Sequence, residues 1–499
     1  MTAASRTRPS QSNRWAALLV LCAGMLMIVL DMTIVNVALP SIQDDLGFSG
    51  SSLAWVVNAY LIAFGGLLLL AGRLGDLISR RRIFLAGLGV FTGASLLCGL
   101  APNQGVLVAA RFVQGAGGAM TSAVILGMIV TLFPEPRDQA KAIGVYAFVA
   151  SSGGSIGLLV GGAITQVLDW HWIFFVNGPI GIATALLAAR LLERDTGPGL
   201  RNGADLPGAV LITGALMLAV YTIVKPAAED GWGARATLAC GATSLLLLAA
   251  FVVREATARS PLIPLRIFRS RTIVGANLTQ ALGAAGMFGT FFLGSLYLQR
   301  VLGYDALQIG LSFLPVTLVM GILSLRYTDR LAMRFGARRT VIYGLVPIAA
   351  GLVLFAQAPV DAAFATDLLP VMLLLGAGAG ICFPALMNLA MSGATPSDAG
   401  LASGLVNTTA QVGGALALAV LATLSSSHTE TLAHRGVPSA SALTGGYHLA
   451  FWIAAALVAA AIGVAVAIVP RATGERAAPG GAHTPEPLAS ASGVPTAAA

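Results

Sequence analysis

Fourteen long apolar segments constrain what this chain can fold into. Each is long enough to cross a bilayer as a helix of about 20 residues. Only 10% of the 499 residues are charged, against about 25% in a soluble domain. Lipid offers the backbone no hydrogen-bond partners, so segments of this length must be helical. The sequence therefore predicts an all-α integral membrane protein with spans at about 15–40, 52–72, 83–101, 105–133, 140–166, 172–191, 206–224, 236–253, 273–298, 306–326, 339–357, 366–391, 399–424 and 447–470. The segments 206–224 and 236–253 could instead form a hairpin at the membrane interface.

The basic residues predict how these spans are oriented. With the N-terminus in the cytoplasm, four of the 29 Lys and Arg residues (Lys225, Arg235, Arg300 and Arg435) fall in outer loops, Arg111 falls within a span, and the other 24 fall on the inner side. Basic residues gather on the cytoplasmic side of membrane proteins, so both termini are predicted to be cytoplasmic. The net charge of +8 is then a topology signal, and no nucleic-acid partner is expected.

Motifs for several other activities are missing. A Walker P-loop needs Gly-Lys followed by Ser or Thr, whereas Lys141 and Lys225 are followed by Ala and Pro, so ATP hydrolysis by that route is excluded. The four cysteines and the pair His428 and His434 lack ligand spacing. We therefore expect no metal, no organic cofactor and no enzymatic activity.

Asp31 is the one acidic residue deep in a predicted span. A carboxylate there costs about 2.5–3.5 kcal/mol on insertion scales, so a functional role is the default interpretation. Arg111 lies about 9 Å inside the fourth span and Asp31 about 13 Å from the outer end of the first, at 1.5 Å per residue. Their similar depth predicts a shared pocket. The alternative is an arginine that extends to the interface independently of Asp31.

Two similar loops indicate an internal repeat. The loop 72–82 and the loop 326–339 each run from an apolar span through an acid to a cluster of arginines. In the first, Gly72 and Gly75 are expected to permit a tight reversal, and Asp76 to cap the next helix or pair with an arginine. The repeat predicts two pseudo-symmetric six-helix bundles with two extra central helices between them.

Glycines in the fifth span recur every four residues. Gly153, Gly157 and Gly161 share one helix face and are joined by Gly162, which allows another helix to approach closely. A gating role and plain packing are both compatible with this pattern.

These features together resemble the major facilitator superfamily, specifically its fourteen-helix drug:proton antiporter branch of the EmrB/QacA type. The resemblance covers roughly 15–470 and rests on the Asp31 segment, the 72–82 loop, the segment 111–118, the glycines of the fifth span, the segment 170–179 and the segment 400–414. The branch usually has a proline after the glycine that matches Gly157, and this chain has Leu158. The domain organisation implied is an N-tail 1–14, a bundle 15–195, two added helices 206–253, a linker 254–272, a bundle 273–470 and a disordered tail 471–499.

The resemblance implies a proton-coupled exporter of a hydrophobic or amphipathic drug in the bacterial cytoplasmic membrane, with the proton gradient as its energy source. Asp31 and Arg111 would couple protons. A conformational latch would comprise Gly72, Gly75, Asp76, Arg80, Arg81, Asp329 and Arg330, although these arginines could serve topology alone. Polar candidates for the substrate cavity are Asn36, Asn58, Gln114, Trp172, Asn177, Asn407 and Gln411, each of which could also cross-link helices. A proton-coupled uptake symporter and a non-transporting membrane sensor are the alternatives.

Overall fold

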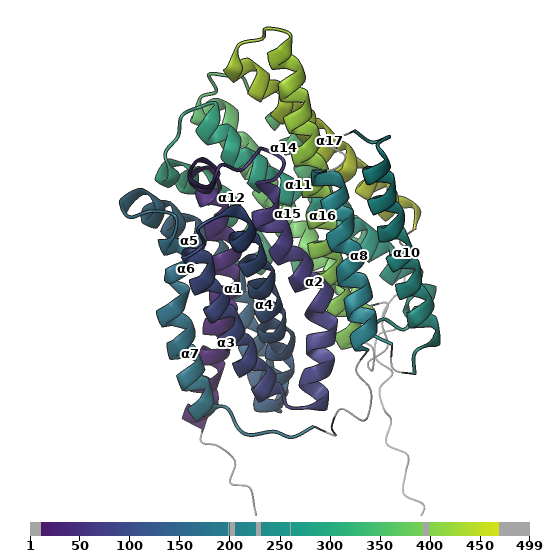
Figure 1. The fold of residues 1–499 in the computed structure, drawn as a ribbon. Helices are drawn as coiled ribbons and strands as arrows, with labels where there is room; N and C mark the ends of the chain where they lie inside the picture. Colours follow the sequence, from purple (N-terminus) through teal and green to yellow (C-terminus); the bar gives the residue numbers. More distant parts are fainter. Residues whose placement is uncertain are drawn as a thin grey trace, which may run out of the picture.

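The computed structural model describes residues 11–468 except 198, 200–204, 226–230, 260 and 393–398. Within these residues, thirteen helices are long and apolar enough to cross a membrane. Helix α5 (Pro136–Val167) coincides with the remaining predicted span. The helices lie side by side in one elongated bundle (Figure 1), and the described residues contain no strand. Residues 1–10 of the predicted N-tail and the whole predicted tail 471–499 lie outside the described residues.

The helices follow the predicted order. The first half contains α1 (Gln11–Leu46), α2 (Ala54–Leu77), α3 (Arg80–Gly99), α4 (Gln104–Leu132), α5, α6 (Trp172–Phe175) and α7 (Asn177–Leu191). The two extra helices are α8 (Leu206–Val224) and α10 (Arg235–Thr257). The second half contains η2 (Leu265–Arg269), α11 (Arg271–Arg300), α12 (Ala306–Arg326), α13 (Thr328–Phe335), α14 (Ala337–Phe355), η3 (Phe364–Leu368), α15 (Leu369–Ser392), α16 (Ala399–His434) and α17 (Ser439–Ala467).

Helices α1 and α16 continue past their predicted ends. Helix α1 passes through Pro40 to Leu46. A proline inside a helix loses one backbone hydrogen bond and crowds the preceding turn, and burial of Leu39 and Ile42 offsets this cost by keeping the next turn packed. Helix α16 extends to His434 and α17 begins at Ser439, so most of the predicted polar loop 425–446 is helical. There the Thr429 hydroxyl donates to a carbonyl of its own helix, and polar side chains satisfied in this way are compatible with a helix.

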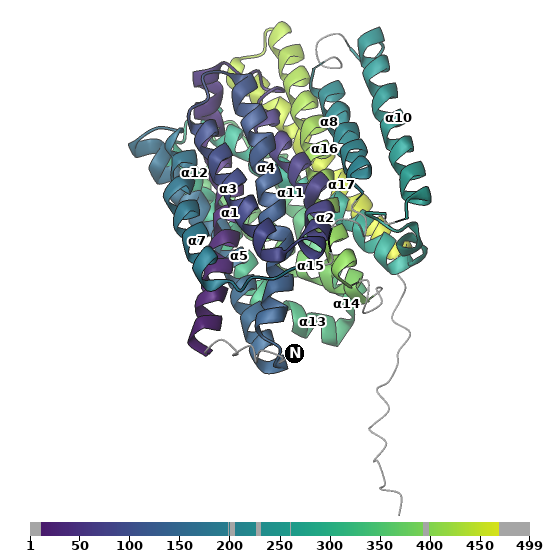
Figure 2. The same ribbon diagram turned by 60° about the horizontal axis from the view of Figure 1, so that its bottom comes forward.

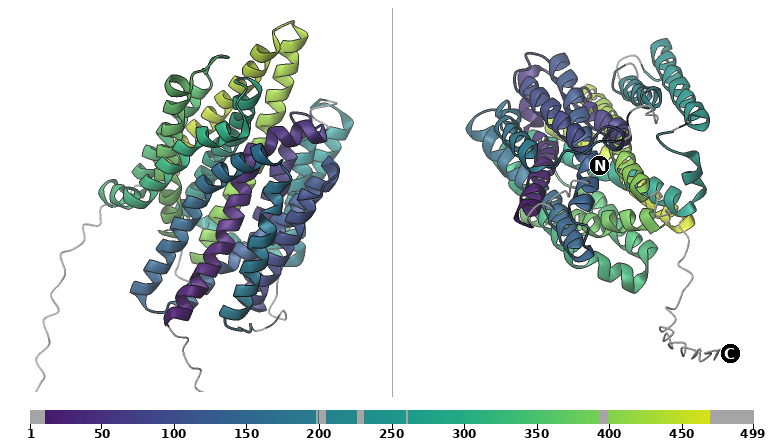
Figure 3. Two further views of the ribbon diagram at one scale, coloured as in Figure 1. Left: turned by 90° about the vertical axis from the view of Figure 1, so that its left-hand side faces the viewer. Right: turned by 90° about the horizontal axis from the view of Figure 1, so that it is seen from below.

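The extra helices α8 and α10 are central in the sequence but peripheral in space. They run beside each other along the outside of the bundle (Figure 2), and the view from below shows the teal pair standing apart from the other helices (Figure 3). The Ser244 hydroxyl of α10 donates to the carbonyl of Ala215 in α8. On the other side of α8, a Cβ on Gly66 of α2 would lie 2.6 Å from the Thr213 hydroxyl oxygen. Both helices have spanning length, which disfavours the alternative of an interfacial hairpin.

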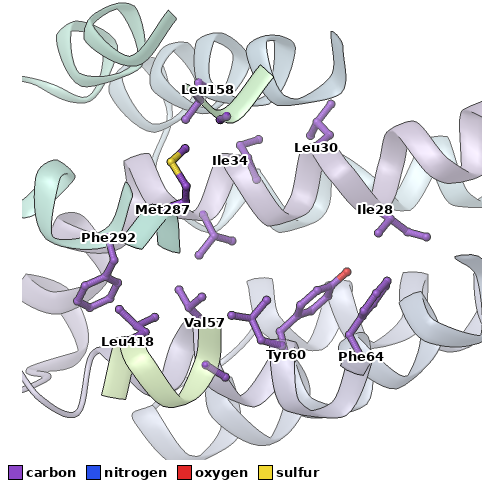
Figure 4. Packing of buried hydrophobic residues seen from close by; sticks show 14 of the residues in the cluster. Ile28, Leu30, Ile34, Val57, Tyr60, Phe64, Leu158, Met287, Phe292 and Leu418 are labelled. Carbon is purple, nitrogen blue, oxygen red and sulfur yellow. The ribbon is translucent and has the colours of Figure 1, made fainter. Parts of the chain in front are cut away.

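The apolar core is continuous across the two halves. In Figure 4, Val57 of α2 lies near Leu418 of α16 and Phe292 of α11, and Tyr60 and Phe64 face α1. All five side chains belong to one buried cluster. The halves therefore meet through close helix packing in this structure.

Candidate functional site: a buried carboxylate network

Asp31 lies in the middle of α1 and is fully buried. Its Oδ2 accepts a hydrogen bond from Arg111 Nη1 at 2.6 Å. Its Oδ1 accepts from Gln114 Nε2 at 2.8 Å and from Asn177 Nδ2 at 3.0 Å. The predicted shared pocket of Asp31 and Arg111 is confirmed, because the two side chains form a direct ion pair.

Arg111 is held on several sides within α4 and its neighbours. Its Nε donates to the carbonyl of Val56 at 3.0 Å, and Nη1 also donates to Gln114 Oε1 at 2.7 Å. The guanidinium lies over the Tyr60 ring, 4.4 Å from the ring centroid. Each contact restricts the rotamers of a side chain that is 1% exposed. Arg111 does not reach the interface, which rules out the alternative of an independent snorkelling arginine.

Asn177 connects the carboxylate to a break in the sixth span. The break at Val176 separates α6 from α7, and Asn177 begins α7. Its Nδ2 donates to Asp31 and also to Ser95 Oγ at 3.0 Å, while the Ser95 hydroxyl donates to the carbonyl of Phe174 at 2.9 Å. The network therefore joins α1, α3, α4 and α7, all of which belong to the first half.

The charges in this network balance. One carboxylate and one guanidinium pair away from water, and three donors satisfy the carboxylate. A proton on Asp31 would remove the negative charge that Arg111 neutralises, leaving a buried cation without its partner, which is a costly state. The arrangement can therefore convert the binding of a proton into a rearrangement of Arg111 and the helices around it.

Gln114 and Asn177 take the second of their two predicted roles and cross-link helices. The sequence groups them with the polar candidates for a substrate cavity, but both bind Asp31 and are fully buried. The physical reason is that a buried carboxylate needs several donors, and neutral amides supply them without adding charge. Ser95 was not among the sequence-based candidates, because a single serine in an apolar span carries no distinguishing signal.

The other polar candidates differ in burial and in hydrogen bonding. Asn36 donates to a carbonyl of its own helix. Asn58 is fully buried and neither of its amide atoms has a hydrogen-bond partner. Trp172 is 47% exposed at the start of α6. Asn407 is exposed, and Gln411 is half-buried with its Oε1 unpartnered.

The first latch loop is shorter than predicted. Helix α2 continues to Leu77, so Gly72 and Gly75 are helical residues and do not form a reversal. A Cβ on Gly75 would overlap Val124 of α4, and this close approach is what requires a glycine. Asp76 Oδ1 lies 2.9 Å from Arg80 Nη2. Of the two roles predicted for Asp76, pairing with an arginine is therefore confirmed.

Asp195 is an additional member of this region. It accepts hydrogen bonds from Ser79 Oγ and from the backbone N–H groups of Arg80 and Arg81. Partial burial acts in the opposite direction, but these hydrogen bonds lower the pKa of Asp195 from its ordinary value of 3.8. The region lines a pocket of about 550 Å³ whose lining residues include Arg14 and do not include the Asp31 network.

The second latch loop contains a short helix. Asp329 and Arg330 lie on α13, and the side chain of Asp329 is outside the described part of the structure. Arg330 is exposed. Gly336 ends α13 with a φ of +81°, a conformation that favours glycine. The two loops are thus similar in sequence but differ in structure, because the α2–α3 connection has no equivalent helix.

The glycines of α5 pack against two helices. On one face, a Cβ on Gly157 would overlap Thr33 of α1 and lie 3.0 Å from the carbonyl oxygen of Leu30, and a Cβ on Gly161 would lie 2.6 Å from the Ile34 side chain. On another face, a Cβ on Gly162 would lie 2.6 Å from the carbonyl oxygen of Ala306 in α12. Gly153 shares the α1 face, where its Cβ would lie 3.0 Å from Val29. The predicted close helix approach is confirmed.

The two halves also meet through polar contacts at the C-terminal ends of α1 and α5. Arg300 at the end of α11 forms an ion pair with Asp44 and donates to Gln43 Oε1 at 3.3 Å. Gln166 of α5 donates to Asp305, which precedes α12, at 3.3 Å. These contacts hold this end of the bundle closed in the structure.

The comparison with protein families agrees with this fold and network. The family model described as "Major Facilitator Superfamily" matches residues 21–418. The chain belongs to the Major Facilitator Superfamily. The puromycin resistance protein pur8 of Streptomyces alboniger is 40% identical over 439 residues, 87% of each chain. The cephamycin export protein CmcT of Amycolatopsis lactamdurans is 42% identical over 420 residues, 84% of this chain and 86% of the relative.

Solved structures show the same major facilitator fold. A bacterial homologue of the human lysosomal transporter Spinster, in an inward-facing conformation, superposes with a TM-score of 0.66 at 16% identity, covering 92% of this chain and 97% of the other. The nucleoside transporter NupG superposes with a TM-score of 0.63 at 12% identity, covering 91% and 100%. The chain is thus a multi-pass membrane protein with the fold of a transporter.

Proposed function

We propose that this protein exports a hydrophobic or amphipathic small molecule of the antibiotic type across the bacterial cytoplasmic membrane in exchange for protons. The observation that carries the proton coupling is the buried ion pair of Asp31 and Arg111. The names of the bacterial relatives, which include puromycin resistance and cephamycin export, support an antibiotic as the transported compound.

Asp31 is the proton-binding group in this proposal. When a proton binds Asp31, Arg111 loses its counter-charge and turns toward its remaining acceptors, Gln114 and the Val56 carbonyl. The contacts of Asp31 with α4 and α7 weaken together. When the proton leaves toward the cytoplasm, the ion pair forms again and restores the packing seen here.

Helix α5 carries this change to the other half. One glycine face contacts α1 beside Leu30, the residue before Asp31, and the other contacts α12. A shift of α1 therefore alters how α5 packs against the second half. The Asp44–Arg300 pair opens when the outer side opens.

The orientation in this proposal places both chain termini in the cytoplasm. The excess of basic residues on that side supports it, and so does the prediction of an even number of spans. The latch region around Asp76 and Arg80 is then cytoplasmic, and the Asp44–Arg300 pair faces outward.

Inverted membrane vesicles with an imposed pH gradient test the function. Their lumen corresponds to the outside of the cell, so an antiporter accumulates radiolabelled puromycin when the lumen is acidic, and the lumen becomes more alkaline as it does so. An uptake symporter would accumulate the compound only with the opposite gradient. A membrane sensor would show neither response.

Two variants make this assay specific. Asp31→Asn is expected to abolish gradient-driven accumulation, whereas Asp361→Asn, at an exposed acid, is expected to retain it. Accumulation by Asp31→Asn at normal expression would remove Asp31 from the coupling role. If puromycin is not transported, a neutral and a monovalent amphipathic dye distinguish an unsuitable probe from an inactive protein.

A further inference from the structure

Two acidic side chains are buried together at one end of the extra helix pair. Asp205 directly precedes α8, and Glu255 lies in the last turn of α10. The residues are 3% and 4% exposed. Neither belongs to the Asp31 network, and neither has a role in the function proposed above.

One oxygen of each carboxylate is satisfied. Asp205 Oδ1 accepts from the backbone N–H of Gly208 at 3.1 Å and from Arg254 Nε at 3.0 Å. Glu255 Oε2 accepts from the backbone N–H of Ile263 at 2.8 Å. These contacts connect the start of α8, the end of α10 and the segment that leads to η2.

The other two oxygens both lie close to Gly208 and lack a donor among the described residues. Asp205 Oδ2 and Glu255 Oε1 are buried and have no hydrogen-bond partner. A Cβ on Gly208 would lie 2.6 Å from Asp205 Oδ2 and 3.0 Å from Glu255 Oε1. Ionised carboxylates can only accept hydrogen bonds, so neither oxygen can satisfy the other without an added hydrogen or cation.

The charge count leads to the same requirement. Among the described residues, Arg254 is the cation in contact with this pair, and its side chain is 44% exposed. Apolar side chains also pack here, since Leu70 of α2 and Leu262 of the segment before η2 share one buried cluster with Ala209 of α8. Two carboxylates and one guanidinium leave one excess negative charge at two side chains with little exposed surface, and an uncompensated buried charge is costly.

We propose that Asp205 and Glu255 together bind one proton, carried on Glu255 Oε1 and donated to Asp205 Oδ2. The proton is placed on Glu255 because Arg254 and a backbone N–H donate to Asp205, whereas no ion pair to Glu255 is found among the described residues. The added hydrogen satisfies both unpartnered oxygens and removes the excess charge. The bound proton thereby fastens α8 to α10 and, through Ile263, to the segment that continues into the second half.

This site makes the attachment of the extra helices dependent on pH. When the proton is lost as the pH rises, two carboxylates repel each other in a confined space, and the stability of the helix pair falls. The sign is opposite to that of an ordinary surface carboxylate paired with a base, which loses its stabilising contact as the pH falls.

Infrared spectroscopy of the purified full-length transporter tests the proposal directly. Near neutral pH, the wild type should show the absorption of a protonated carboxyl group that is absent from Glu255→Gln. Asp205→Asn should also lose it, because the new amide N–H donates to Glu255 and lets that side chain ionise. Glu430→Gln, at an exposed glutamate, should keep the absorption.

Thermal unfolding provides a second measurement. Buried carboxyl groups can have pKa values between about pH 5 and pH 9, so melting temperatures are compared across this range. As the pH rises through it, the melting temperature of the wild type should fall further than that of Glu255→Gln, and the difference between the two falls should be on the order of 2 °C. Equal infrared spectra of wild type and Glu255→Gln would overturn the proposal. So would a wild type that keeps its stability at high pH in sodium chloride but not in choline chloride, because the bound species would then be a metal ion.

Discussion

Replacing Asp31 with asparagine tests whether the buried network is built around a charge. The two side chains have nearly the same shape, but asparagine has one oxygen and an amide nitrogen that donates. In the wild type, Oδ2 accepts from Arg111, and Oδ1 accepts from both Gln114 and Asn177. The substitution therefore changes hydrogen bonding and charge while leaving packing intact.

The cost of Asp31→Asn follows from counting donors. With its oxygen toward Arg111, the new amide group meets the amide groups of Gln114 and Asn177. Turning Asn177 over would bring its unpartnered Oδ1 to the new amide group but would end its donation to Ser95 Oγ. Turning Gln114 over would lose the bond from Arg111 to its Oε1. At least one buried donor therefore remains unsatisfied, so we expect a loss of about 1–3 kcal/mol of unfolding free energy in a protein that still folds.

Arg111→Ala should cost more. It removes the cation and leaves a buried carboxylate unpaired, which costs about 3–5 kcal/mol. The double variant should be more stable than the sum of the single effects implies, with a coupling of about 0.5–3 kcal/mol. Denaturant unfolding in detergent measures stability, and the vesicle assay measures transport, which both single variants should lose. Additive stability effects, or an Arg111→Ala protein as stable as Asp31→Asn, would refute the ion-pair argument.

Four further predictions concern other parts of the molecule. Gly157→Val should reduce both export and melting temperature, because its side chain overlaps α1, whereas Gly89→Ala, with nothing within 4 Å, should leave both unchanged. Arg300→Gln should favour opening of the outer side, which would be measured as faster labelling of an outward-facing cysteine introduced in a cysteine-free background. High salt should reduce the difference in labelling rate from wild type, because the Asp44–Arg300 pair is exposed. Asp195 has a lowered pKa in the folded protein, so its contribution to stability is complete above its ordinary pKa of 3.8 and is lost as the pH falls through the lower pKa of the folded state. Asp195→Asn should therefore flatten this part of the plot of melting temperature against pH. A bis-quaternary biocide should be exported poorly compared with a monovalent dye, because α12 has no acid and a second desolvated charge would be unpaired. Export of the biocide that depends on Asp31 would contradict this last expectation.

The sequence could predict the position of the coupling pair because helix geometry is regular. A fixed rise per residue places Asp31 and Arg111 at similar depths, and burial of two opposite charges then favours contact. The α5 glycines could be predicted for the same reason, since a spacing of four defines one helix face. Both inferences needed only local geometry and the cost of charge in lipid.

The remaining features depend on tertiary contacts that no local pattern records. Gly75 resembles a turn residue, but it serves the close approach of α2 and α4. Asn177 resembles a cavity residue, because a polar side chain facing inward can line a cavity or bind another buried group. The peripheral position of α8 and α10 follows from the packing of α8 against α2 and of α10 against α8, and their apolar sequences fit either position.

The arrangement explains why glycines are needed beside a proton site. The Asp31 network lies wholly in the first half, so protonation cannot act on the second half through any direct polar contact of that network. Close packing of α5 is the available route, with Gly157 against Leu30 of α1 and Gly162 against Ala306 of α12. Packed backbones transmit small displacements because they have little free volume. A larger residue at Gly162 should therefore leave the Asp31–Arg111 pair intact and still impair transport, which separates the transmission of the signal from its origin.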